Sequence, residues 1–183
     1  MSSSKTYPLV LTAFGAAVIA VLAQVTIPLP LVPITGQTLA IGLVVTILGT
    51  KYGTVAVLLY ILLGSVGLPV FAGFSGGFSH VVGPTGGYIV GFLPTAYIMG
   101  IYLNKFGFTY PHAIMANIIG MIVTLTFGTI WLKFAADMTF YAAFMAGAAP
   151  FIIVGIIKGV IAAWAGILVR NRLLSANLLQ QIA

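Results

Sequence analysis

The chain has 183 residues, of which 61% are hydrophobic and only 4% are charged, whereas a soluble domain is about one quarter charged because its surface faces water. Much of the surface must therefore face lipid, and residues 1–183 are predicted to form a single integral membrane domain. With no cysteine, two histidines and one acidic residue, the chain lacks the side chains for a metal site, a cysteine nucleophile or an acid/base pair, so we expect binding or transport without a cofactor rather than catalysis.

The N-terminal part of the chain contains three apolar segments. A spanning helix needs about 20 mostly apolar residues, and the first such segment covers residues 8–25. Three prolines follow within residues 26–33, where they leave backbone carbonyls without helical donors, so we expect an extended outer loop. Residues 36–50 and 52–66 are both short for a span, and the sequence leaves open whether they form two short helices or one re-entrant hairpin.

The segment 67–87 is the least regular part of the chain, since it is rich in glycine, proline and phenylalanine and yet remains apolar. Irregular backbone at membrane depth is stable only where protein buries it or where it lines a cavity. Three further spans are predicted over residues 88–103, 111–132 and 149–169, and the connector 133–148 carries the only acidic residue. The prediction is an all-α polytopic membrane protein with six transmembrane helices.

The basic residues predict the orientation, because cytoplasmic loops are enriched in Lys and Arg. With six spans, one side of the membrane receives most of them, namely Lys5, Lys51, Lys105, Arg170 and Arg172. The other side receives Lys133, which Asp137 offsets. Both termini are therefore predicted to lie in the cytoplasm. The basic residues stand too far apart to form a nucleic-acid-binding patch, so no nucleic acid is expected as a partner.

Lys158 is the basic residue that this topology does not explain, because it lies near the middle of the sixth predicted span. A lysine at the centre of a span costs roughly 2.5–3.5 kcal/mol, and such residues usually face a cavity or a partner. A lysine that snorkels to the interface along its aliphatic stem is the alternative, which the central position disfavours. No intramembrane carboxylate is present to pair with it, so its partner is a ligand anion, backbone carbonyls or water. A ligand carboxylate is the leading hypothesis.

The glycine-rich segment 67–87 is a second candidate for a ligand site, because its glycines let backbone groups approach a ligand closely. It also supplies three apolar rings and three polar side chains, those of Phe71, Phe74, Phe78, Ser79, His80 and Thr85. The alternative is an ordinary loop that caps the bundle. It is not a phosphate-binding loop, since no Lys-Ser/Thr pair follows its glycines on a helix.

The first predicted helix carries alanines four residues apart, Ala13 and Ala17, a spacing that lets another helix approach closely. Packing against the protein's own helices is the commoner reason for such a pattern. Several polar residues lie near helix ends, where hydrogen bonds between helices are commoner than ligand contacts. These residues are Gln24, Gln37, Asn117, and Tyr88 with Thr85.

Three motifs, taken in their order along the chain, resemble the BioY family, whose members are the biotin-specific S-components of energy-coupling factor (ECF) transporters. The motifs are VPITGQTL at residues 32–39, GFSGGF at residues 73–78 and GPTGGY at residues 83–88. The similarity runs from the first helix to the sixth span and so covers nearly the whole chain. Their combination is specific, although no single motif would be.

The resemblance implies six helices with a biotin pocket near the outer face, closed by the loops after helices one and three. It implies a multi-pass protein of the bacterial cytoplasmic membrane, with a T-component and two cytoplasmic ATPases as partners and ATP hydrolysis outside this chain. Ala13 and Ala17 match positions that contact the T-component in the family. Together with the residue chemistry, the resemblance points to a biotin site formed by Lys158, Gly73, Phe74, Gly76, Phe78, Ser79, Gly83, Thr85, Gly86, Tyr88 and Gln37.

The sequence departs from the family pattern at one position. Family members often carry an acid three residues before the lysine of the sixth span, but here Gly155 takes that place while Lys158 is kept. The hydrogen bonds of that acid must therefore come from elsewhere or be absent. Two alternatives come from other classes of function. One is an intramembrane enzyme acting on lipid, which the lack of paired acids argues against, and the other is a self-sufficient secondary transporter or channel for another small anion or vitamin.

Overall fold

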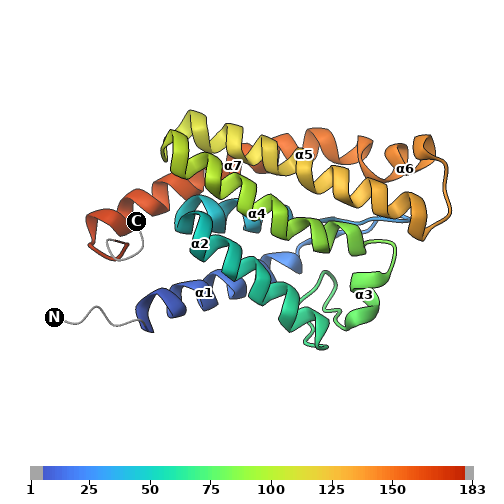
Figure 1. Cartoon of the computed structure of the whole chain (residues 1–183), viewed down its shortest axis with the longest axis horizontal. Helices are drawn as coiled ribbons and strands as arrows, with labels where there is room; N and C mark the ends of the chain where they lie inside the picture. The colour runs from blue at the N-terminus through green and yellow to red at the C-terminus, as the bar shows by residue number, and fades with distance from the viewer. Residues whose placement is uncertain (1–5, 180–183) are drawn as a thin grey trace.

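The computed structural model describes residues 6–179, which form helices that run broadly along one long axis (Figure 1). The helices are α1 (Thr6–Ala23), α2 (Gln37–Ser65), α3 (Phe78–Val82), α4 (Gly86–Phe106), α5 (Tyr110–Ala135), α6 (Phe140–Gly147) and α7 (Ala149–Ser175). Two short strands, β1 (Thr26–Ile27) and β2 (Ile34–Thr35), pair antiparallel and enclose the proline loop. The structure thus adds short helices in two segments for which the sequence predicted none, α3 in the glycine-rich segment and α6 in the connector before the last span.

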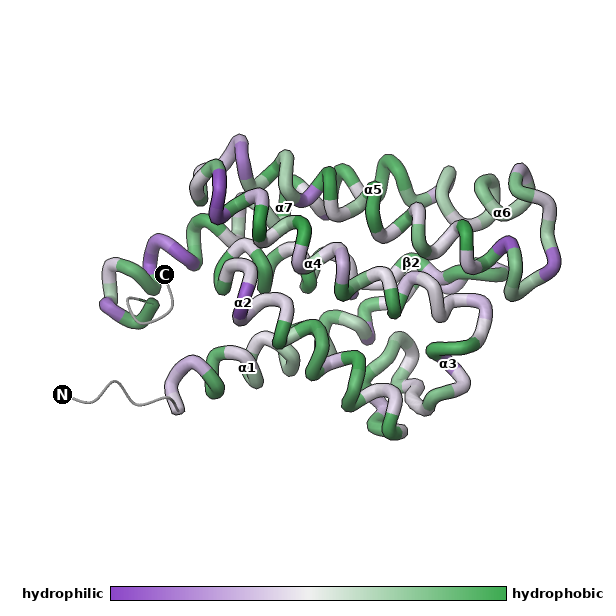
Figure 2. Tube along the Cα trace, viewed as in Figure 1, coloured by the Kyte–Doolittle hydropathy of each residue, from purple (hydrophilic) through white to green (hydrophobic). Residues whose placement is uncertain are grey.

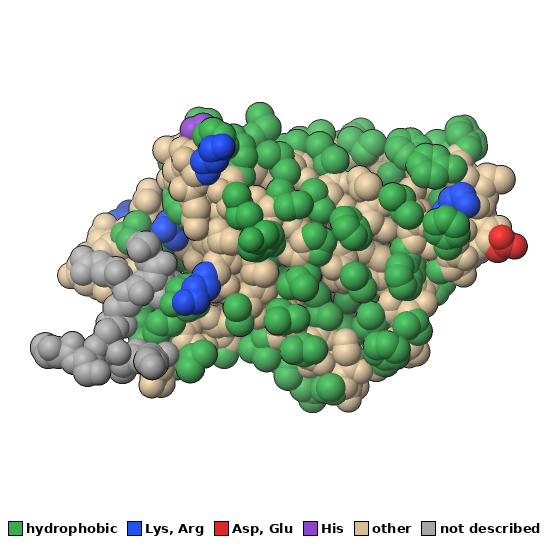
Figure 3. Space-filling view, viewed as in Figure 1, with side chains coloured by type: hydrophobic (Ala, Val, Ile, Leu, Met, Phe, Trp, Pro, Cys, Tyr) green, Lys and Arg blue, Asp and Glu red, His purple; other side chains and the backbone are tan. Residues whose placement is uncertain are grey.

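The surface of the bundle is that of a membrane protein. Five segments are long and apolar enough to cross a membrane: α1, α2, α4, α5, and α6 together with α7. Figure 2 shows mostly hydrophobic or neutral positions along these helices, with hydrophilic stretches toward the two ends of the bundle. On the face drawn in Figure 3, hydrophobic side chains cover the middle, most of the basic ones lie toward the left end, and one basic side chain and the acidic one lie at the opposite end. The protein is therefore a multi-pass membrane protein whose helices face lipid.

Helix α2 is folded back on itself at Gly49. Its backbone there has φ 73° and ψ −167°, a region that is essentially restricted to glycine. Gln37 Nε2 donates a 2.6 Å hydrogen bond to the Tyr60 hydroxyl, although 23 residues in a straight helix would separate the two by roughly 34 Å. A Cβ added to Gly53 would lie 3.0 Å from Val45 Cα, which places the two halves in direct contact. The segments predicted as 36–50 and 52–66 are thus two antiparallel helical halves joined by a tight break.

Arg170 supports this fold-back from α7. The sequence predicts Arg170 among the basic residues of the cytoplasmic side, but its side chain is only 5% exposed. Its guanidinium donates a hydrogen bond to the Ile47 carbonyl oxygen and lies 3.6 Å from the centre of the Phe108 ring. Carbonyls in the last turn of a helix lack intrahelical partners, and Ile47 lies in the turn before Gly49. Arg170 therefore caps the first half of α2. Arg172, another of the basic residues used to predict the topology, is exposed. Lys5, the first of the predicted topology markers, lies outside the described residues.

Candidate functional site

A cavity of about 360 Å³ lies between the β1–β2 loop, the first half of α2, the glycine-rich segment, α4, α5 and α7. Its volume falls within the range of roughly 300–1,000 Å³ that is usual for small-molecule sites. Most of the wall is apolar and includes the side chains of Val32, Ile41, Phe71, Ile89, Phe92, Leu125 and Phe151. Polar groups also line the cavity, and two sets of them form opposite walls.

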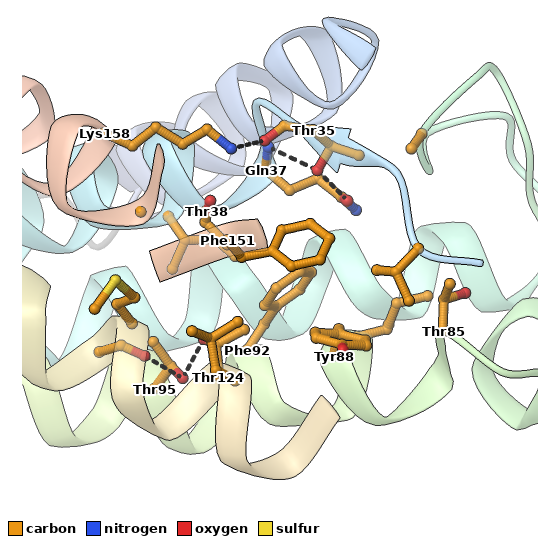
Figure 4. A pocket seen from close by; sticks show the side chains of 18 of the residues that line it. Thr35, Gln37, Thr38, Thr85, Tyr88, Phe92, Thr95, Thr124, Phe151 and Lys158 are labelled. Carbon is orange, nitrogen blue, oxygen red and sulfur yellow. Dashed lines mark hydrogen bonds between the residues drawn. The ribbon is translucent and has the colours of Figure 1, made fainter. Parts of the chain in front are cut away.

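The first polar wall is built around Lys158 (Figure 4). Its ammonium group donates a 2.8 Å hydrogen bond to the carbonyl oxygen of Thr35 at the end of β2. The Thr35 hydroxyl donates a 2.7 Å hydrogen bond to Gln37 Oε1, and Gln37 Nε2 donates in turn to Tyr60 on the second half of α2. A lysine ammonium has three N–H donors, and no ion pair to Lys158 is present within residues 6–179. Donors of Lys158 therefore remain for a ligand in the cavity.

The second polar wall lies between α4 and α5. Thr95 Oγ1 donates a 3.4 Å hydrogen bond to the Gly120 carbonyl oxygen and is 2.8 Å from Thr124 Oγ1. Figure 4 shows Thr95 and Thr124 across the cavity from Lys158, with Phe92 and Phe151 between the two walls. This arrangement suits a ligand that has an apolar middle and hydrogen-bonding groups at both ends.

Comparison with known proteins gives the family. A profile of the BioY family matches residues 1–175. The chain belongs to the BioY family, and the resemblance seen in its motifs is confirmed. It is 42% identical over 161 residues to the biotin transporter BioY2 of Lactococcus lactis subsp. cremoris, covering 88% of each chain. It is 40% identical over 147 residues to the biotin transporter BioY of Thermotoga maritima, covering 80% of this chain and 86% of that protein.

The fold agrees with a solved member of the same group. A 2.1 Å crystal structure of the S-component for biotin from an ECF-type ABC transporter superposes with a TM-score of 0.86. The match covers 93% of this chain and 94% of that one, at 28% sequence identity. The helical bundle with its folded α2 thus belongs to an architecture that has been observed experimentally.

The structure brings together only part of the site that the sequence predicted in this BioY protein. Four of the predicted residues line the cavity: Lys158, Gln37, Thr85 and Tyr88. The predicted residues that are not among the lining groups are Gly73, Phe74, Gly76, Phe78, Ser79, Gly83 and Gly86. The same segment contributes neighbours of those residues instead, namely Phe71, Ala72, Ser75 and His80.

The direction of each side chain in the glycine-rich segment explains this difference. Phe71 is 2% exposed and points inward, whereas Phe74 and Phe78 are 73% and 65% exposed. At Gly76 a Cβ would collide with the Leu68 carbonyl oxygen, so this glycine allows the segment to turn closely past its own backbone. Because this segment has no helical or strand periodicity, the sequence could not show which of its side chains point into the cavity.

Gly155, at the position where the sequence departs from the expected family pattern, lines the cavity together with Lys158. A Cβ added to Gly155 would lie 2.5 Å from the Met121 sulfur, so Met121 fills the space beside it. In this chain the Thr35 carbonyl oxygen is the acceptor for Lys158. A backbone carbonyl therefore holds the ammonium group in place of a carboxylate.

Other lining residues carried no signal in the sequence that identified them as ligand contacts. Thr35, Thr95 and Thr124 are ordinary polar residues. Asn117, which the sequence suggested only as an interhelical contact, donates to the Ala113 carbonyl and to Thr46 and also lines the cavity.

On α1, Ala13 and Ala17 are exposed, whereas Gly15 packs against Val44 and Ala56 of α2. The outward face of α1 therefore carries the small residues that the sequence singled out.

Proposed function

We propose that this protein binds biotin in the cavity beside Lys158 and acts as the substrate-binding subunit of an ECF-type importer. The observation that carries the proposal is an intramembrane lysine that lines a cavity and has no acidic partner within residues 6–179. A cation at that depth is costly unless it has a partner or a functional ligand. The biotin transporters among the BioY relatives support the choice of ligand.

The cavity has the complementary chemistry for biotin, which carries a carboxylate at one end, a hydrogen-bonding ureido group at the other, and apolar atoms between them. We assign the apolar atoms to the space between Phe92 and Phe151 and an oxygen of biotin to Lys158. The opposite end then meets the hydroxyls of Thr95 and Thr124. Either the carboxylate or the ureido oxygen meets Lys158 in this arrangement, and the two orientations are tested separately below.

We further propose that the bundle crosses the membrane six times with both termini in the cytoplasm. Each half of the folded α2 then counts as one span, which returns α2 to the side of the membrane where it began. Lys51, just after the break in α2, and Lys105 and Arg172, in the last turns of α4 and α7, are exposed on one side. Lys133, in the last turn of α5, and Asp137, which follows that helix, lie on the other. The positive-inside rule favours the cytoplasm for the first group. The cavity then opens toward the outer face.

Transport itself is proposed to require a T-component and two ATPases, with the exposed face of α1 around Ala13 and Ala17 as the contact for the T-component. Small residues at that spacing allow two helices to approach closely in lipid. ATP hydrolysis belongs to the partner ATPases in this scheme. The competing hypothesis, a self-sufficient secondary transporter or channel, predicts uptake without those partners.

Calorimetry of the purified protein in detergent tests the proposal, after native mass spectrometry has shown whether a ligand co-purifies. We expect saturable binding of one biotin per chain, and tight binding of a different vitamin with none of biotin would overturn the substrate assignment. Uptake of labelled biotin is then measured in cells with and without the T-component and ATPase genes. Uptake that is independent of those genes would overturn the importer assignment and favour the self-sufficient transporter.

A further inference from the structure

Gln24, directly after the last residue of α1, contacts four backbone groups with one side chain. Its Nε2 lies 2.9 Å from the Ala20 carbonyl oxygen, 3.3 Å from that of Val70 and 3.1 Å from that of Phe71. Its Oε1 accepts a 2.7 Å hydrogen bond from the Phe74 amide. Three of these contacts reach residues 46 to 50 positions away, in the segment that follows α2. Figure 1 shows that segment, between α2 and α3, beside the end of α1.

The segment that Gln24 holds, residues 67–77, forms part of the cavity wall. Phe71, Ala72 and Ser75 line the cavity, although Gln24 itself does not. The Phe71 ring is buried and meets the Tyr60 ring edge-to-face with 5.6 Å between the centroids. Tyr60 is also the hydrogen-bond partner of Gln37 on the Lys158 wall. A shift of this segment would therefore change the cavity from the side of the glycine-rich loop.

Few hydrogen bonds attach this segment to the rest of the bundle. Leu68 and Gly77 donate to the carbonyl oxygens of Leu63 and Gly64, which attaches both ends of the segment to α2. Its middle is attached to α1 through Gln24 alone among the hydrogen bonds of residues 6–179. Phe74, which donates to Gln24, has φ 55°, a left-handed conformation that is unfavourable for a phenylalanine and persists only where the surroundings hold it.

We propose that Gln24 is a positioning residue that latches residues 67–77 over the cavity and thereby sets the rate at which the ligand is released. Without its side chain the carbonyl oxygens of Val70 and Phe71 and the Phe74 amide lose their shared partner. The middle of the segment then opens, while its two ends stay attached to α2. This inference rests on the proposed function only for the identity of the ligand, because the latch itself is visible without one.

The test compares Gln24→Met with Thr26→Val. Methionine keeps the length and apolar packing of Gln24 and removes the hydrogen bonds of its side-chain amide. Thr26→Val removes a local hydrogen bond to the Ala23 carbonyl oxygen, which does not reach the segment. In the ligand-free protein, amide hydrogen exchange in residues 67–77 is expected to become about tenfold faster in Gln24→Met, a factor equivalent to the net loss of one or two hydrogen bonds. Thr26→Val is expected to exchange like the unmodified protein.

The second readout is the rate of biotin release, which is expected to rise by about the same tenfold factor in Gln24→Met alone. Gln24→Glu keeps the acceptor for the Phe74 amide but not the donor for the two carbonyls, so it should protect that amide while still releasing ligand faster.

Unchanged exchange in Gln24→Met would overturn the latch, whatever the ligand. Faster exchange with unchanged biotin release would overturn its control of the site. Failure of the unmodified protein to bind biotin would instead contradict the proposed function and leave the exchange result valid.

Discussion

Lys158 is held by a backbone carbonyl rather than by an acidic side chain, which is one of the ways in which a cation inside a membrane bundle is paired. The carbonyl of Thr35 carries a partial charge, so it orients the ammonium group without neutralising it. Its remaining N–H donors are therefore available to a ligand oxygen. Gly155 has no side chain, and the Met121 thioether occupies the space beside it. The Lys158 ammonium group is thus paired with the dipole of the Thr35 carbonyl and not with a carboxylate.

The first prediction at the scale of single residues concerns the charge itself. Lys158→Met is expected to weaken biotin binding by about 10- to 100-fold, since a hydrogen bond to a charged group contributes roughly 1.5–3 kcal/mol. Lys105→Met is the matched control, because Lys105 is exposed in the last turn of α4 and does not line the cavity. Calorimetry on both variants measures the effect. Equal affinities of the two variants would remove Lys158 from the site.

A biotin derivative with its carboxylate capped as an amide distinguishes the two orientations. If Lys158 binds the carboxylate, capping should weaken binding to the unmodified protein and have little further effect in Lys158→Met, because the two changes remove the same interaction. If Lys158 binds the ureido oxygen, the two losses should add. The non-additive free energy from this cycle therefore assigns the end of biotin that faces Lys158.

At the scale of elements, the fold-back of α2 organises the site. Its first half carries Gln37 and Ile41 into the cavity, and its second half supplies Tyr60 behind them. The two halves have this relation because Gly49 adopts a conformation that other residues avoid. Arg170 then caps the carbonyl of Ile47 from α7. A break in one helix is thus stabilised by a charged side chain from another.

Gly49→Ala is therefore expected to destabilise the protein by about 1–3 kcal/mol, the cost of placing a non-glycine residue in this region of φ and ψ. The added Cβ would have contacts of 3.3 Å to Asn104 and 3.5 Å to Phe108, so strain and not collision is the main cause. The measurement is the thermal unfolding midpoint in detergent. Lys51→Ala, an exposed position two residues away, is the control and should change stability by less than about 0.5 kcal/mol. Equal midpoints for the two variants would contradict a requirement for glycine.

At the scale of the whole molecule, orientation in the membrane can be tested directly because the chain has no cysteine. Single substitutions Lys51→Cys and Asp137→Cys place a thiol at each end of the bundle. A membrane-impermeant maleimide is expected to label position 137 in intact cells and position 51 only after permeabilisation. The cysteine-free parent is the background control. Labelling of position 51 from outside would contradict the cytoplasmic placement of the fold-back and with it the six-span topology.

Several features of this protein follow from the sequence because they are properties of local composition. Apolar segments of sufficient length predicted an all-α membrane protein, and the motifs around residues 32–39, 73–78 and 83–88 indicated the BioY family, which the comparisons confirmed. Lys158 could be identified from the sequence because it is a charged residue within a long run of apolar residues. Each of these inferences depends on neighbours in the chain, which the sequence lists directly.

The tertiary structure alone decided which side chains meet. Lys158 and Thr35 are 123 residues apart, and Gln24 and Phe74 are 50 apart, so no periodicity relates them. In the glycine-rich segment the structure turns Phe71 inward and Phe74 outward, because left-handed residues and close backbone contacts set the direction of each side chain. The chain therefore determined by itself that it lies in the membrane and carries a lysine within an apolar span. The contacts between distant segments decided where the cavity lies and what holds its wall.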